Sequence, residues 1–290
     1  MGFLTDPWSW WVEPFDNPAM RNALWAVLLT ALCTSLVGTW VVLRGMSFLG
    51  DALAHGVLPG IAIAFVLGGD TTLGALIAAL VMVFGVNVVR TSSPLPDDAS
   101  IGILFVGFLA LAVVVMSSDS ASYTGDLNRF LFGSITGVDR ADLARQAVTT
   151  AITVLGVVVL HRALLAGTFD ERQAQLLGLR PRMTHVALLV LLALAIIGSF
   201  ATVGNLLVFA FLIAPPATAT LLVRRVPSIM AAAVLIGAAC GVVGLLLSYH
   251  RSTAAGATMA LTTVILFFLV LIGRSLAGRL QASRYAPEHG

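Results

Sequence analysis

Two ionisable side chains, Asp51 and His55, lie four residues apart in a stretch that is otherwise apolar enough to cross a membrane. In a helix this spacing places both side chains on one face, one above the other. An ionisable group in the middle of a membrane helix costs about 2.5–3.5 kcal/mol on insertion scales, so such a pair needs a compensating role or a partner. The pair indicates either a site with a function or an internal hydrogen bond that locks two helices together.

Imidazole and carboxylate are suitable ligands for zinc and manganese. A neutral His55 and an ionised Asp51 offer a dication one net negative charge, which offsets part of the hydration that the ion loses in a passage of low dielectric constant. Two ligands are fewer than the four of a structural zinc site, and this shortfall suits transport because the ion must also leave. We therefore expect Asp51 and His55 to be ligands along the path of a divalent metal, with no metal bound permanently.

The composition identifies the elements that carry this pair as membrane helices. Of the 290 residues, 59% are hydrophobic and 10% are charged, and the mean hydropathy is +0.99. A soluble domain carries about 25% charged residues. Apolar runs of about 20 residues, the length that a helix needs to cross a bilayer, recur along the whole chain. They predict an all-α, polytopic bundle of eight or nine membrane helices near 20–43, 47–68, 71–89, 99–116, 146–165, 184–200, 203–223, 229–248 and 254–273.

The basic residues indicate the orientation of the bundle and exclude one kind of nucleotide site. All sixteen are arginine. Because a phosphate-binding loop of the GxxxxGK[ST] type needs a lysine, this chain contains none, and any ATP that the protein uses is bound by another polypeptide. With the N-terminus outside and nine crossings, eleven arginines lie on the inner side and five on the outer side. This excess follows the positive-inside rule and assigns the C-terminus to the cytoplasm.

The pattern predicts one transmembrane domain with a short segment at each end. Residues 1–19 contain Trp8, Trp10 and other aromatic side chains that suit the headgroup level of a membrane, so they are expected to form an interfacial segment. Residues 20–275 form the single transmembrane domain, and residues 276–290 form a cytoplasmic tail.

One cytoplasmic connection, residues 168–182, is polar and has helix signals at both ends. It begins with Thr168 or Asp170 as a helix start and ends at Gly178 and Pro181. The segment is therefore predicted to contain a short cytoplasmic helix. Such a helix either simply connects two spans or offers a charged surface to a soluble partner.

Glycines and prolines predict irregular points within the bundle. Gly198 and Gly204 flank a short junction between the sixth and seventh spans, where a break is expected. Pro215 and Pro216 remove two backbone donors from the seventh span, which a membrane tolerates where protein or water satisfies the freed carbonyls. A kink that lines the interior of the bundle is expected there. Pro59, in the second span, is a further candidate for a kink or gate.

Four stretches of the chain resemble one family in the same order. Residues 44–60 read RGMSFLGDALAHGVLPG, which is similar to the (R)-x-M-S-x-x-G-D-x-x-x-H block of the zinc, manganese and iron permeases of bacterial ATP-binding-cassette importers, the ABC-3 type. Residues 130–133 after Asp126 resemble the family's D-L-x-x-Y-L-F-G. Residues 203–219 resemble V-G-x-L-L-V-x-x-x-L-I-x-P-A-A-x-A, and residues 174–181 resemble the A-x-x-L-G-L-x-x segment of its coupling region.

The resemblance implies a permease subunit in the bacterial plasma membrane that is not itself an enzyme. It implies a second permease copy, most simply in a homodimer, two copies of a cytoplasmic ATPase and an extracytoplasmic metal-binding protein. The permease would also contact membrane lipid, and no nucleic acid is expected as a partner. The segment 168–182 would be the coupling element received by the ATPase, with the residues Asp170, Glu171, Gln175, Leu177, Gly178 and Leu179. Asp126 would be a further metal ligand near the outer mouth. The histidine favours Zn²⁺ as cargo, with Mn²⁺ next and Fe²⁺ third.

The chain departs from the family pattern at three places. Ala254–Gly256 replace a P-[ST]-G turn, Phe130 replaces a tyrosine, and Pro216 replaces a small residue.

Two other functions are compatible with a polytopic helical chain. A permease for a metal chelate, of the siderophore or cobalamin type, would share the helical plan but needs no dense ligand pair. An intramembrane metalloprotease would need the HExxH arrangement, which the sequence lacks.

Overall fold

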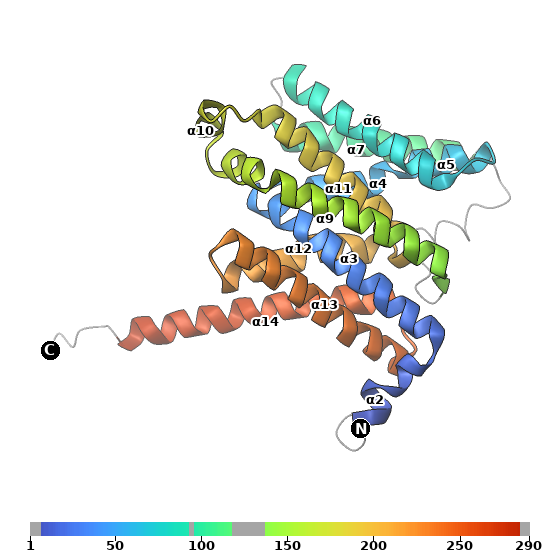
Figure 1. Ribbon diagram of the computed structural model, residues 1–290, viewed down its shortest axis with the longest axis vertical. Helices are drawn as coiled ribbons and strands as arrows, with labels where there is room; N and C mark the ends of the chain where they lie inside the picture. The colour runs from blue at the N-terminus through green and yellow to red at the C-terminus, as the bar shows by residue number, and fades with distance from the viewer. Residues whose placement is uncertain (1–6, 93–95, 118–136, 285–290) are drawn as a thin grey trace.

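The computed structural model describes residues 7–92, 96–117 and 137–284, and within these ranges the chain is helical with no strand. Asp126 and the motif at 130–133 lie outside the described residues. The helices, labelled in Figure 1, are α2 (Pro7–Trp11), the 3-10 helix η1 (Glu13–Asp16), α3 (Pro18–Leu43), α4 (Ser47–Gly56), α5 (Leu58–Val66), α6 (Thr71–Ser92), α7 (Asp97–Ser117), α9 (Arg140–Phe169), α10 (Glu171–Leu176), α11 (Pro181–Val203), α12 (Asn205–Leu222), α13 (Val226–Arg251) and α14 (Ala255–Arg284).

Nine helical stretches of the described chain are long and apolar enough to cross a membrane, and α4 and α5 together make one of them. The predicted all-α bundle is confirmed. Figure 1 shows α10 and the C-terminal end of α14 at one end of the bundle, and α2 at the opposite end. An odd number of crossings requires this separation of the two chain ends. Together with the excess of arginines, it puts α10 and the end of α14 on the cytoplasmic side.

Helix α3 is the most buried of the spans and forms the centre of the bundle. It packs against α9, α11, α12 and α13, and its fully buried Trp40 belongs to the main apolar core. A polar contact joins it to α9: the Gln146 side-chain amide donates to the Ala26 carbonyl at 2.9 Å and to the Thr30 hydroxyl at 2.8 Å. Helices α7, α9 and α14 are largely exposed, so their apolar faces are left for lipid or for another chain.

The break expected between the sixth and seventh spans is present and involves a single residue. Gly204 separates α11 from α12 with φ 80° and ψ 161°, a conformation that is essentially restricted to glycine. Asn205 then opens α12 and is buried. The chain therefore reverses between two membrane helices without a loop.

The N-terminal segment is attached to the outer end of α13. The ring of His250 stacks on Trp10 with centroids 4.7 Å apart and planes 13° apart, and His250 Nε2 lies 3.1 Å from the Trp10 carbonyl oxygen. Phe15 packs against the main core, whereas Trp8 is 69% exposed. One aromatic side of this segment is thus held by protein while Trp8 is free to contact lipid headgroups.

Three helix boundaries differ from those expected from the sequence. The fifth span begins at Arg140 rather than near 146, because Asp139 caps α9 by accepting from the Asp142 backbone N–H. The cytoplasmic helix is shorter than 168–182, since α9 continues through Phe169 and α10 covers only Glu171–Leu176. Helix α14 extends to Arg284, beyond the expected end of the last span near 273, so the expected tail at 276–290 begins as helix.

The contact between α5 and α6 depends on two facing glycines and gives a testable prediction. A Cβ atom on Gly60 would meet the backbone carbonyl oxygen of Gly74, and a Cβ atom on Gly74 would meet that of Gly60. Close approach of small residues is a common way for membrane helices to pack. Gly74→Ala is therefore expected to lower the thermal unfolding midpoint in detergent, because overpacking costs about 1–3 kcal/mol.

Gly107 in α7 is the matched control, because no heavy atom lies within 4 Å of the Cβ position there. Gly107→Ala is expected to leave the midpoint unchanged or slightly raised, since alanine is favoured over glycine in a helix by about 1 kcal/mol. Equal midpoints for the two variants would contradict the close approach of α5 and α6.

Candidate functional site

Helix α4 carries both predicted metal ligands and ends directly after them. The second span is divided at Val57 into α4 and α5. Pro59 is the second residue of α5, and its nitrogen has no hydrogen to donate to the His55 carbonyl four residues earlier. The break in the helix thus follows from the proline that the sequence marked as a kink. It places the pair at the end of one helical segment rather than inside a continuous one.

The Asp51 and His55 side chains approach each other without a hydrogen bond. His55 Nε2 lies 3.6 Å from Asp51 Oδ1, beyond hydrogen-bond distance, and the side chains are 25% and 29% exposed for His55 and Asp51 respectively. The separation of these two atoms is close to that between two donor atoms that each bind the same metal ion at about 2.0–2.2 Å. Both residues belong to one helix, so the pair does not lock two helices together.

The rest of α4 explains why these two side chains remain accessible. The opposite face is buried: Gly50 packs on Leu212 of α12, and Gly56 packs on Met82 of α6. Asp51, His55 and the exposed Phe48 are spaced by three, four and seven residues, so they share the remaining face. The ligand pair therefore stands on the side of α4 that a single copy of the chain leaves open.

Phe105 of α7 borders this open face. Its ring makes edge contacts with His55 at 5.7 Å and with Phe48 at 6.1 Å between centroids. The His55 Nδ1 atom is buried and has no hydrogen-bond partner among the described residues. Packing against Phe105 thus restricts the imidazole while its Nε2 atom faces Asp51. Sequence reasoning missed Phe105, because nothing in its apolar surroundings marks it.

Within the described residues, no group of three or more His, Cys, Asp or Glu side chains could hold a metal ion. Asp51 and His55 are therefore a pair there, and a complete coordination shell needs donors from elsewhere.

The coupling segment is organised by a short helix and a left-handed glycine. Ala174 is fully buried and anchors α10, while Gln175, Leu177 and Asp170 are exposed. Gly178 has φ +73°, and the Leu179 N–H donates to the Ala174 carbonyl at 3.0 Å, which closes the helix in a manner typical of a glycine C-cap. Leu179 is half-buried, and Glu171 opens α10.

Two leucines of this segment have no apolar surroundings. Leu176 is 88% exposed and Leu177 is 67% exposed, on the cytoplasmic end of the molecule where no lipid tail covers them. Neighbouring exposed apolar side chains on an otherwise polar surface are candidates for a contact with another protein. The family resemblance implies a coupling role for Leu177 but not for Leu176, although two adjacent leucines after four polar or small residues are a usable signal for both.

Arg44 connects this region to α4. It follows α3 at the turn that opens α4, and its Nε donates to the Thr168 hydroxyl at 2.9 Å. Its Nη2 lies 3.4 Å from the Leu164 carbonyl oxygen, which also accepts from the Thr168 hydroxyl at 2.6 Å. The guanidinium thereby binds the last turn of α9, immediately before the coupling segment.

The proline pair of α12 is buried within a helix that continues through it. Pro215 lies against α13, where its Cγ would be 3.6 Å from a Cβ on Gly237. Pro216 leaves the Leu212 carbonyl without its usual donor, and this carbonyl faces Gly38 of α3. The absence of a side chain at Gly38 lets α3 approach the freed carbonyl. The role of the prolines as a gate stays a prediction.

Comparison with known proteins identifies the class. Residues 16–274 match the model of the ABC 3 transport family. The chain is 36% identical to "Manganese import system permease protein ScaB" of Streptococcus parasanguinis, over 87% of this chain and 89% of that protein. It is 33% identical to "Probable iron transport system membrane protein" of Haemophilus influenzae, over 91% of this chain and 96% of that protein.

A solved structure agrees with these relatives. "PsaBC from Streptococcus pneumoniae in complex with Fab" superposes with a TM-score of 0.79 at 33% identity, over 88% of this chain and 91% of that chain. The fold and the signature around Asp51 and His55 therefore define a multi-pass metal permease subunit of the ATP-binding-cassette type, located in the bacterial plasma membrane. The chain belongs to the ABC 3 transport family, and the resemblance seen in the sequence is confirmed.

Proposed function

We propose that this permease conducts a divalent transition metal ion into the cytoplasm through a position formed by Asp51 and His55. The observation that carries the proposal is the pair itself: an imidazole nitrogen and a carboxylate oxygen 3.6 Å apart, on the open face of α4. A naked dication loses hydration energy in a bilayer, and one anionic and one neutral ligand offset part of that loss. Two ligands bind weakly enough for the ion to move on.

Further donors would complete the site during transport. A second copy of the chain, placed against the open face of α4, would bring a second Asp51 and His55 to the same path. Asp126, which the family resemblance puts near the outer mouth, would add a carboxylate at the entrance. A homodimer is favoured because the pair is partly exposed in a single copy, which a pathway between two copies would use.

The cargo is proposed to be Mn²⁺. The ScaB relative is named for manganese and shares more identity with this chain than the relative named for iron. The imidazole alone favoured zinc, but a mixed nitrogen and oxygen donor pair also suits manganese. The names of the relatives thus support the choice among ions, and the distance between Asp51 and His55 supports their role as ligands.

The energy for transport would come from a separate ATPase that binds the coupling segment, residues 168–182. Leu176 and Leu177 offer it an apolar contact, and Gly178 fixes the turn that follows. An extracytoplasmic binding protein would deliver the metal at the opposite end of the bundle. The assembly is thus a permease pair with two ATPase copies and one delivery protein.

Uptake into proteoliposomes that contain the permease, its ATPase and its binding protein tests the cargo. Radioactive Mn²⁺ is expected to accumulate with ATP, and unlabelled Mn²⁺ is expected to compete better than Zn²⁺ or Fe²⁺. Better competition by Zn²⁺ or Fe²⁺ would overturn the choice of manganese. Transport of a metal chelate without transport of the free ion would overturn the proposal as a whole.

A further inference from the structure

A pocket at the cytoplasmic end of the bundle has no role in the metal path. It has a volume of about 460 Å³ and lies between the end of α12 and α14, open to the outside. Its lining contains the apolar residues Leu221, Leu222 and Val270, the small Gly273, and two arginines, Arg224 and Arg274. A pocket of this size is large enough for a small ligand or a lipid headgroup.

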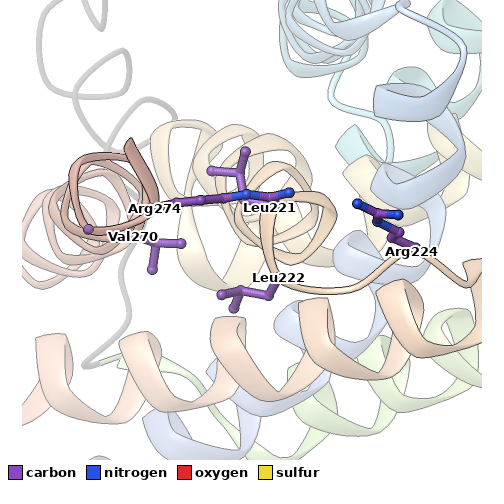
Figure 2. A pocket seen from close by; sticks show the side chains of 6 residues that line it. Leu221, Leu222, Arg224, Val270 and Arg274 are labelled. Carbon is purple, nitrogen blue, oxygen red and sulfur yellow. The ribbon is translucent and has the colours of Figure 1, made fainter. Parts of the chain in front are cut away.

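The two arginines face the same space. Figure 2 shows the Arg274 side chain extending from α14 past Leu221, and the Arg224 side chain reaching toward it from the connection after α12. Both residues are exposed, and neither has an acidic partner or a hydrogen bond among the described residues. No acidic residue lines the pocket. The site therefore offers two uncompensated guanidinium groups above an apolar wall.

We propose that this pocket binds the phosphate headgroup of an anionic phospholipid of the inner leaflet. Arg224 and Arg274 would bind the phosphate oxygens, for which the guanidinium geometry is suited. Leu221, Leu222 and Val270 belong to spans that enter the bilayer here, so they would contact the first part of the acyl chains. Basic pockets between membrane helices on the cytoplasmic side are suited to anionic lipids. A soluble anion would gain nothing from the apolar wall.

Gly273 makes the proposal testable without a change of charge. Gly273 lines the pocket and no heavy atom lies within 4 Å of its Cβ position, so a larger side chain there would occupy open space without disturbing the packing of the helix. Gly273→Leu should therefore block the headgroup. Arg224→Gln together with Arg274→Gln should remove the phosphate ligands. Arg162→Gln is the control, because Arg162 is exposed near the cytoplasmic end of α9 and away from the pocket.

The test uses the complex with its ATPase in nanodiscs of phosphatidylethanolamine, with and without phosphatidylglycerol. Native mass spectrometry measures retained phosphatidylglycerol, and the thermal midpoint measures stabilisation. The double arginine variant and Gly273→Leu are expected to lose retention by about tenfold or more, whereas Arg162→Gln retains it. Equal loss in Arg162→Gln would show only a general effect of positive charge and overturn the proposal. Equal stabilisation by inorganic phosphate would overturn it too.

A second inference comes from a different contact. We infer that Arg44 is a positioning residue that ties the coupling segment to the metal-bearing helix, a role that rests on the proposed function. Its guanidinium holds the last turn of α9 through Thr168 and Leu164, while its backbone forms the turn that opens α4. Thr168 lies two residues before Asp170, and Arg44 lies seven residues before Asp51. A displacement of α10 by the ATPase would thus move the beginning of α4.

This link is tested by the ratio of ATP hydrolysed to metal transported in the reconstituted complex. Arg44→Ala and Thr168→Val are expected to raise the ratio about fivefold or more, with Arg44→Lys intermediate, because lysine provides charge but not the two-pronged donor. The double variant should be no worse than Arg44→Ala alone, since Arg44→Ala already removes the contact with Thr168. If all variants lose uptake and hydrolysis in the same proportion, Arg44 has only a structural role. The proposed function then still stands, because metal uptake by the wild type is measured separately.

Discussion

His55→Ala is expected to abolish ATP-driven uptake of divalent metal while the permease still assembles with its ATPase. The imidazole is one of the two candidate metal-ligating side chains, His55 and Asp51, that the described part of α4 brings together. Loss of a residue that merely supports a metal ligand typically costs about 10–100-fold in affinity or activity, so loss of a ligand should cost at least about 100-fold. Uptake of labelled Mn²⁺ into proteoliposomes measures the effect.

Asp51→Asn should reduce uptake as strongly, because it keeps the size of the side chain but removes the negative charge that compensates the dication. Phe48→Leu is the control: Phe48 lies on the same face of α4 and has no atom that binds a metal. It should transport at nearly the wild-type rate. If His55→Ala retained uptake of the free ion and lost only uptake of a chelate, the pair would not be the metal path.

The positions of the spans could be predicted from the sequence because hydropathy is a local property. A run of about 20 apolar residues reports its own membrane crossing, whatever it packs against. The same holds for Asp51 and His55, whose shared face follows from their spacing alone. Gly204 is also a local signal, because the backbone angles between α11 and α12 are ones that glycine adopts more readily than other residues.

The surroundings of the pair could not be predicted because they are made by residues distant in the chain. Phe105 reaches His55 from α7, and Met82 packs on Gly56 from α6. Such contacts depend on how the helices cross. The 3.6-residue period of a single helix shows which residues share a face but not which other helix that face meets. The contact of Arg44 with Thr168 spans 124 residues for the same reason.

The coupling segment shows where local signals compete. Thr168 and Asp170 are both good helix starts, and the sequence predicts one helix over 168–182. In the structure the Thr168 hydroxyl binds the Leu164 carbonyl, so that residue belongs to the end of α9 instead. The new helix begins only after Asp170. The Gly178 stop was predictable, because it is a property of one residue and its backbone angle.

Leu177→Glu, combined with Leu176→Glu, is expected to separate the permease from its ATPase. The two leucines are 67% and 88% exposed, so the change leaves the folded permease intact. An apolar side chain buried at the centre of a protein interface contributes about 2 kcal/mol or more, which is about 30-fold in affinity. A carboxylate there also has to be desolvated without a partner. Co-purification of the ATPase and ATP-driven uptake should both fall.

A matched substitution on the other side of the membrane distinguishes this from a general effect of charge. Leu67 is 78% exposed at the outer end of α5, so Leu67→Glu introduces the same carboxylate at a similarly exposed leucine. It should leave the ATPase bound, since the cytoplasmic partner never reaches that side. If the ATPase remained bound to the Leu176 and Leu177 variant, α10 would be only a connection between spans. The ATPase would then need another contact on the permease. Arg44 would then not transmit a movement of α10 to α4.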